Sequence, residues 1–151
     1  MRIPGDHDEL VATFGDASAY IGNTAMWESM YIVSVPSPSG LLLFAEQPVR
    51  SIRCHRLAAP YFATALGNLR DAGSSKLEYN GSYCFRVNRR NPKALSMHAW
   101  GIAIDFNAST CPLGSSPSRQ NPLIVHAMID AGFHWLDHEN DPMHFQLAFG
   151  V

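Results

Sequence analysis

The chain has 151 residues, of which 46% are hydrophobic, 11% aromatic and 16% charged. This length and composition are typical of one domain with its own core and exclude disordered, collagen-like and coiled-coil chains. Eleven lysines and arginines stand against thirteen aspartates and glutamates, so we expect no nucleic-acid partner. No repeat or change in composition divides the sequence, and we interpret residues 1–151 as a single domain. We expect a monomer.

The sequence predicts neither a membrane span nor a secretion signal. Its longest apolar run, Leu41 to Ala45, is far shorter than the roughly 20 residues that cross a bilayer. Met1 to Glu9 has no apolar region behind a basic start. We therefore expect a protein that is made in the cytoplasm and reaches any outside target by release or by another export route.

The three cysteines do not indicate a thiolate metal site, because none of them lies in a CxxC spacing. An odd number cannot all pair within one chain. We expect free thiols, with a bridge between Cys84 and Cys111 as the alternative.

Periodicity in the first half of the chain predicts two helices and two strands. Apolar residues recur at helical spacing before two glycines, and β-branched or aromatic runs flank a turn rich in proline and serine. The expected elements are a helix over Asp8 to Phe14 ending at Gly15, strands over Met30 to Val35 and Leu41 to Ala45 divided by Pro36 to Gly40, and a main helix from Leu57 to Gly73 with Pro60 in its first turn.

The second half predicts three strands and one helix. Gly101 to Asn107 alternates apolar and polar residues, as a strand with one polar edge does. The segment from Ala108 to Pro122 is predicted to be a loop, and such a long loop in a small domain is commonly functional. The remaining expected elements are a helix over Leu123 to Ala131 capped by Gly132, and strands over Phe133 to Trp135 and Met143 to Phe149.

Three residues of these segments have side chains suited to a metal ion. Asp105 lies on the polar face of its predicted strand, His98 lies in the turn before that strand, and His144 lies on the last strand. Two imidazoles and one carboxylate suit a catalytic zinc ion, whose fourth position stays open for water or substrate. The sequence therefore predicts a zinc site made by His98, Asp105 and His144.

Two further groups have the chemistry for catalysis beside such a site. Asp141 precedes His144 by three residues, so it could stand near the metal and take a proton from the attacking water, although it could also be a turn former before Pro142. A developing oxyanion needs a cation besides the metal, and Arg86, Arg89 and Arg90 lie upstream of His98.

The motif SxHxxGxAxD, from Ser96 to Asp105, is followed by DPMHF, from Asp141 to Phe145. This pair of motifs is similar to those of the VanY-like zinc peptidases, a family of D-alanyl-D-alanine carboxypeptidases and L-alanyl-D-glutamate endopeptidases. The resemblance implies that His98, Asp105 and His144 bind Zn²⁺, that Asp141 is the base and that Arg86 assists at the substrate carbonyl, with Arg89 as the alternative. It also implies an α+β fold of the hedgehog/DD-peptidase type, in which an antiparallel sheet carries the metal in a groove and helices pack behind it.

The resemblance implies hydrolysis of a peptide bond in the stem peptides of bacterial peptidoglycan. Because the sequence has no signal or anchor, we favour a lytic endopeptidase of the phage endolysin kind, with D-alanyl-D-alanine carboxypeptidase as the alternative. Two alternatives belong to other functional classes. One is a catalytically inactive, zinc-containing module for cell-wall binding or assembly, and the other is a small-ligand binding domain without zinc.

Several neighbouring side chains have alternative roles. The expected substrate contacts are Ser96, Tyr83, Trp100 and His138, although Ser96 could serve only a turn and Trp100 only the core. His134 and His138 are the rival zinc ligands. The loop from Trp135 to Asn140 is short for the family, and Gln146 replaces a glutamate. Gln146 should face the same side as His144 and hydrogen-bond near the metal.

Overall fold

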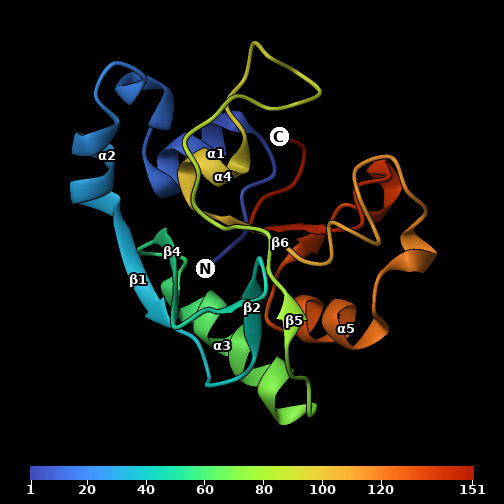
Figure 1. Ribbon diagram of the computed structural model, residues 1–151. Coiled ribbons are helices and arrows are strands. Elements are labelled where there is room, and N and C mark those ends of the chain that lie inside the picture. Colours follow the sequence, from blue (N-terminus) through green and yellow to red (C-terminus); the bar gives the residue numbers. More distant parts are fainter.

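The computed structural model describes residues 1–151 and contains five α-helices, eight short strands and three 3-10 helices (Figure 1). This mixture confirms the predicted α+β class. The helices are α1 (His7–Phe14), α2 (Thr24–Tyr31), α3 (Ala59–Asp71), α4 (Met97–Trp100) and α5 (Pro122–Asp130), and the 3-10 helices are η1 (Ala17–Tyr20), η2 (Pro117–Arg119) and η3 (Asp137–Glu139). The strands are β1 (Ile32–Pro36), β2 (Leu42–Phe44), β3 (Gln47–Pro48), β4 (Ser51–His55), β5 (Leu77–Glu78), β6 (Ala103–Asp105), β7 (His134–Trp135) and β8 (His144–Gln146).

The strands form three small sheets, where the sequence led us to expect one antiparallel sheet. β1 pairs with β4, and β2 lies between β3 and β5 with a parallel pairing to β5. The third sheet has the order β6-β8-β7 and is antiparallel throughout. An isolated bridge between Tyr79 and Phe106 joins the segment after β5 to the end of β6.

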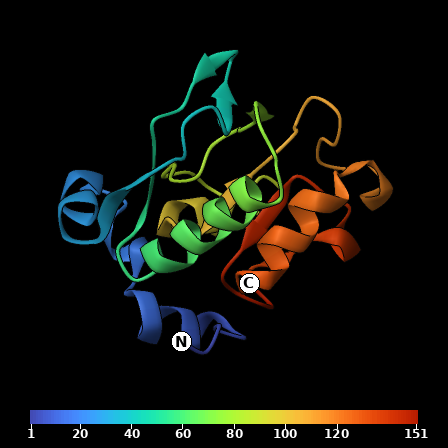
Figure 2. The same ribbon diagram turned by 90° about the horizontal axis from the view of Figure 1, so that it is seen from below.

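Helices α3 and α5 lie side by side against the sheets (Figure 2). Both start with a proline in the first turn, where a missing N–H costs nothing. The amide of Asn68 on α3 donates to the carbonyl of Ala127 on α5 at 3.1 Å, and Phe62 packs edge-on against Phe133 at 5.0 Å between ring centroids. One hydrophobic cluster contains residues from all three sheets and both helices, so this packing holds β6 and β8 in place.

The predicted helices are confirmed with small shifts at their ends. The helix expected over Asp8 to Phe14 is α1, which Asp6 caps by accepting a hydrogen bond from the Glu9 N–H. The helices expected from Leu57 and from Leu123 are α3 and α5. The long loop expected over Ala108 to Pro122 contains the short η2 and ends where α5 begins at Pro122.

The largest corrections fall on the first strands. Met30 and Tyr31 belong to α2, because Asn23 caps that helix and its Trp27 is buried in the core, so the strand begins only at Ile32. The expected strands over Leu41 to Ala45, Gly101 to Asn107, Phe133 to Trp135 and Met143 to Phe149 are the shorter β2, β6, β7 and β8. Helices α2 and α4 and strands β3, β4 and β5 had not been predicted.

All three cysteines are free thiols, so the alternative of a bridge between Cys84 and Cys111 is wrong. Cys54 and Cys111 are buried and Cys84 is exposed. The Cys111 thiol contacts the carbonyl of Asn107 at 3.0 Å. None of the helices has the length and apolar character that crossing a bilayer requires.

His55 is a buried histidine that should make stability depend on pH. Its Nε2 lies 2.9 Å from the Phe14 carbonyl, its Nδ1 accepts from the Leu57 N–H, and Tyr31 stacks on its ring. Burial lowers the pKa of His55 from 6.5 to about 4, although the bond to Phe14 opposes this, and the charge of Arg56 adds to the lowering.

The neutral ring therefore contributes stability that is fully present above pH 6.5 and is lost as the pH falls toward 4. We expect up to about 3 kcal/mol of the free energy of unfolding to disappear across this window. Urea unfolding at a series of pH values measures it, with His55→Gln as the comparison, because glutamine does not titrate. Equal pH slopes for the two proteins would contradict this role of His55.

Candidate metal centre and active site

The antiparallel pairing of β6 with β8 places two of the predicted metal ligands opposite each other. Asp105 and His144 are directly paired in the register, and Gln146 on β8 pairs with Ala103. Directly paired residues in antiparallel strands have neighbouring side chains, and residues two apart on a strand share a face. The sheet therefore sets Asp105, His144 and Gln146 on one surface.

The third predicted ligand, His98, lies on the single turn of helix α4. The Ser96 hydroxyl caps this helix by accepting from the His98 N–H at 3.2 Å. Gly101 ends it with φ +75°, and its carbonyl accepts from the His55 N–H at 2.8 Å. A side chain at Gly101 would meet that nitrogen of His55 at 2.7 Å, so glycine alone permits both the turn and the contact.

These elements bring His98, Asp105 and His144 together in the interior. Nδ1 of His144 lies 3.0 Å from Oδ1 of Asp105, and Nε2 of His98 lies 3.2 Å from Oδ2. One ligand atom from each residue lies within 4.8 Å of the others, and the two imidazole rings meet edge to face at 4.9 Å. All three residues are buried. The structure therefore brings these three side chains together as predicted.

The hydrogen bonding of this cluster fits a cation among its atoms. Nδ1 of His98 lies 2.6 Å from the Ser82 carbonyl, which can only accept, so Nδ1 donates and Nε2 of the neutral ring has a lone pair. That Nε2 is buried without a hydrogen-bond partner beside the Asp105 carboxylate. Two lone pairs held together in the interior are unfavourable unless a positive charge lies between them. Two imidazoles and a carboxylate are also ligands that catalytic zinc sites use.

The pKa shifts in the cluster point to the same preference for positive charge. Burial by itself would raise the pKa of Asp105, but the hydrogen bond from His144 and the neighbouring imidazoles hold it well below the usual range. Burial would lower the pKa of His144, yet the hydrogen bond and charge of Asp105 raise it on balance. Protons and metal ions therefore compete for the same lone pairs, and metal binding should release protons.

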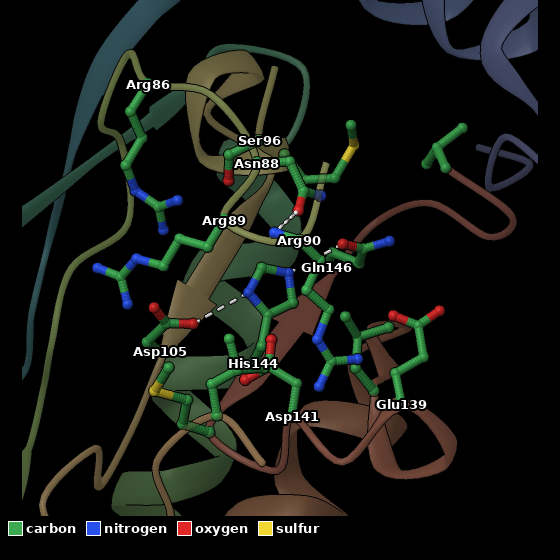
Figure 3. A pocket seen from close by; sticks show the side chains of 15 residues that line it. Arg86, Asn88, Arg89, Arg90, Ser96, Asp105, Glu139, Asp141, His144 and Gln146 are labelled. Carbon is green, nitrogen blue, oxygen red and sulfur yellow. Dashed lines mark hydrogen bonds and ion pairs between the residues drawn. The ribbon is translucent and has the colours of Figure 1, made fainter. Parts of the chain in front are cut away.

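Asp141 lies beside this cluster in the same cavity (Figure 3). Its Oδ1 is buried and has no hydrogen-bond partner. Burial raises the pKa of its carboxyl group, with the charge of Asp105 adding to the rise and that of His144 opposing it. Its backbone carbonyl accepts from the His144 N–H at 3.1 Å, which ties its position to that of His144. A desolvated carboxylate with a raised pKa is a stronger base than one in water.

The cavity is small, and the segment before α4 supplies its cationic wall. Arg86 is half-buried in that wall, while Arg89 and Arg90 are exposed at the rim. Figure 3 shows Arg86 and Arg89 on one side of Asp105 and His144, with Asp141 and Glu139 on another. The predicted choice between Arg86 and Arg89 stays open, because both line the cavity.

Of the predicted substrate contacts, the structure brings only Ser96 to this cavity. Tyr83 does not line the cavity, and the guanidinium carbon of Arg53 lies 4.9 Å from the centroid of its ring. Trp100 is buried in the core and donates its indole N–H to the Gly15 carbonyl at 3.0 Å. His138 is exposed on η3, with its Nε2 3.8 Å from Oδ2 of Asp137, and does not line the cavity. Trp100 has the packing role that was its alternative and also lines a neighbouring hollow, so its contact with substrate stays a prediction.

The rival metal ligands lie outside the cluster. His134 packs against the Phe149 ring at 4.5 Å, and the His138 side chain is 92% exposed. The Ser82 carbonyl that orients His98 had not been predicted, because every residue has a backbone carbonyl and the residue type does not show which one accepts a hydrogen bond. The predicted hydrogen bond of Gln146 near the metal site is present, because its Oε1 lies 2.9 Å from Nε2 of His144 and can accept from it.

Comparison with known proteins identifies one related family. Residues 89–147 match the family model described as D-alanyl-D-alanine carboxypeptidase. This match confirms the resemblance to the VanY-like zinc peptidases and includes His98, Asp105, Asp141 and His144, whereas Arg86 precedes it. Neither the curated proteins nor the solved structures gave a match.

Proposed function

Since residues 89–147 match the VanY-like peptidases, a metal-dependent family, we propose that this protein is a zinc peptidase that hydrolyses stem peptides of bacterial peptidoglycan. The observation that carries the proposal is the buried group of His98, Asp105 and His144 beside the unpartnered carboxylate oxygen of Asp141. A purely structural metal site has no use for a basic carboxylate in an adjoining cavity. We also infer that residues 1–151 form one peptidase domain, since a single hydrophobic cluster extends from Leu10 to Ala148.

Each side chain of the cavity has a role in this reaction. A zinc ion held by His98, Asp105 and His144 would polarise the scissile carbonyl and make water more acidic. Asp141 takes the proton of the attacking water on Oδ1 and passes it to the leaving amine, as a general base and then a general acid. Arg86, with Arg89 as the alternative, would stabilise the negative charge that develops on the carbonyl oxygen.

We favour cleavage within the stem peptide, at an L-alanyl-D-glutamate bond. A second hollow lies between the 87–95 segment, α4 and the C-terminal residues, and it shares Arg90 and Met97 with the lining of the cavity. A substrate can therefore extend beyond the metal cluster, which an internal cut requires and a cut at a free carboxyl terminus does not. The arginines along the wall suit the carboxylate groups of an acidic stem peptide.

Digestion of purified peptidoglycan by the zinc-loaded protein tests this proposal. Mass spectrometry should find freed peptides that begin with D-glutamate, and a chelator should abolish their release. Loss of only one terminal alanine would instead indicate the carboxypeptidase. Absence of any cleavage, with a chelator lowering only the melting temperature, would contradict the peptidase and favour a zinc-containing binding module.

A further inference from the structure

Gln146 lies two residues after His144 on β8 and has a side-chain amide fixed at both ends. The residue is only 3% exposed. Its Nε2 donates to the Ala148 carbonyl at 3.1 Å, and its Oε1 lies 2.9 Å from Nε2 of His144. If the Gln146 amide were flipped, its oxygen would face the Ala148 carbonyl oxygen, and neither atom could donate a hydrogen bond. The amide oxygen therefore faces the imidazole.

Both ring nitrogens of His144 face an acceptor. Nδ1 lies 3.0 Å from the Asp105 carboxylate, inside the cluster of candidate ligands, and Nε2 lies 2.9 Å from the amide oxygen of Gln146. Both nitrogens can donate at once only when the ring is protonated. When a metal ion takes the lone pair of Nδ1, the single N–H of the neutral ring is on Nε2 and donates to Gln146.

We propose that Gln146 is a positioning residue that holds His144 in the tautomer whose Nδ1 is free to bind the metal ion. The Ser82 carbonyl does the same for His98 from the other side, because it accepts from Nδ1 and leaves Nε2 free. The two imidazoles thus offer different nitrogens to one site, each fixed by an acceptor on its far side. Such outer partners fix the ring orientation and the tautomer of metal-binding histidines.

The inference rests on the proposed metal peptidase, but it can be tested by metal binding without any substrate. Two-bond proton–nitrogen NMR spectra of zinc-loaded, ¹⁵N-histidine-labelled protein should show the Nε2–H form for His144, with Nδ1 bound to the metal. The Nδ1–H form in the zinc-loaded, unchanged protein would overturn the inference. That result in an active zinc enzyme would leave the peptidase proposal intact, whereas the Nε2–H form in an inactive protein would contradict the peptidase alone.

Two substitutions separate tautomer control from packing. Gln146→Met fills a similar volume but offers no acceptor, so we expect a zinc affinity lowered by about 10- to 100-fold. Gln146→Glu keeps an acceptor for Nε2 and should retain zinc affinity near that of the unchanged protein, while its second oxygen faces the Ala148 carbonyl and should lower the melting temperature. Competition against a chromophoric chelator measures the affinity.

Gln120→Met is the matched control, because Gln120 is equally buried but contacts none of the three candidate ligands. Its amide donates to the carbonyls of Phe106 and Pro142, both at 3.0 Å. Losing these bonds should lower the melting temperature while the zinc affinity stays unchanged. An unaltered zinc affinity in Gln146→Met would overturn the inference. If that variant does not fold, the spectrum of the zinc-loaded, unchanged protein decides.

Discussion

Replacing Asp141 with asparagine is expected to lower kcat by about 10²- to 10⁴-fold, the usual contribution of a general acid–base group. The substitution keeps the shape of the side chain but removes its ability to take a proton. Asp141 is not one of the three clustered ligand residues, so bound zinc should stay at the level of the unchanged protein. Steady-state hydrolysis of a muropeptide substrate, together with metal analysis of the same sample, checks both parts.

The control for this variant is Asp130→Asn, which makes the same chemical change at the exposed end of α5, away from the cavity. It should retain full activity. Undiminished turnover in a zinc-loaded Asp141→Asn protein would remove Asp141 as the base. Loss of zinc from that variant would instead make Asp141 part of the metal site.

Replacing His144 with alanine should remove metal binding, and with it all measurable hydrolysis. The variant loses one of three ligands and leaves the buried Asp105 carboxylate without the hydrogen bond from Nδ1 at 3.0 Å. We expect zinc affinity to fall by more than about 100-fold, beyond the effect of losing an outer partner of a ligand. Elemental analysis after dialysis, with circular dichroism to verify folding, measures the loss.

His134→Ala and His138→Ala are the controls for this loss, because both histidines lie near His144 in sequence but outside the cluster. Each variant should bind zinc as the unchanged protein does. If His138→Ala loses the metal and His144→Ala keeps it, the ligand set proposed here is wrong.

The convergence of the candidate ligands could be predicted because it follows from strand periodicity and motif spacing. Alternation over Gly101 to Asn107 identified the strand of Asp105 and the face on which that residue lies. The pairing of this strand with the one containing His144 then sets the two side chains opposite each other. Local pattern and the long-range pairing agree at this point of the chain.

Other features could not be predicted, because their elements are too short to show a pattern or depend on distant contacts. Helix α4 is a single turn, so it is too short for the residues around His98 to show a helical periodicity. The parallel pairing of β2 with β5 involves only two residue pairs. The indole N–H of Trp100 donates to the carbonyl of Gly15, a contact between residues far apart in the sequence.

The central claim is that one metal ion lies among His98, Asp105 and His144. A crystal structure of the zinc-loaded protein, with anomalous diffraction collected at the zinc absorption edge, tests it most directly. We predict an anomalous peak bound by Nε2 of His98, a carboxylate oxygen of Asp105 and Nδ1 of His144. A peak held by other side chains, or these three pointing apart with no ion between them, would contradict the account.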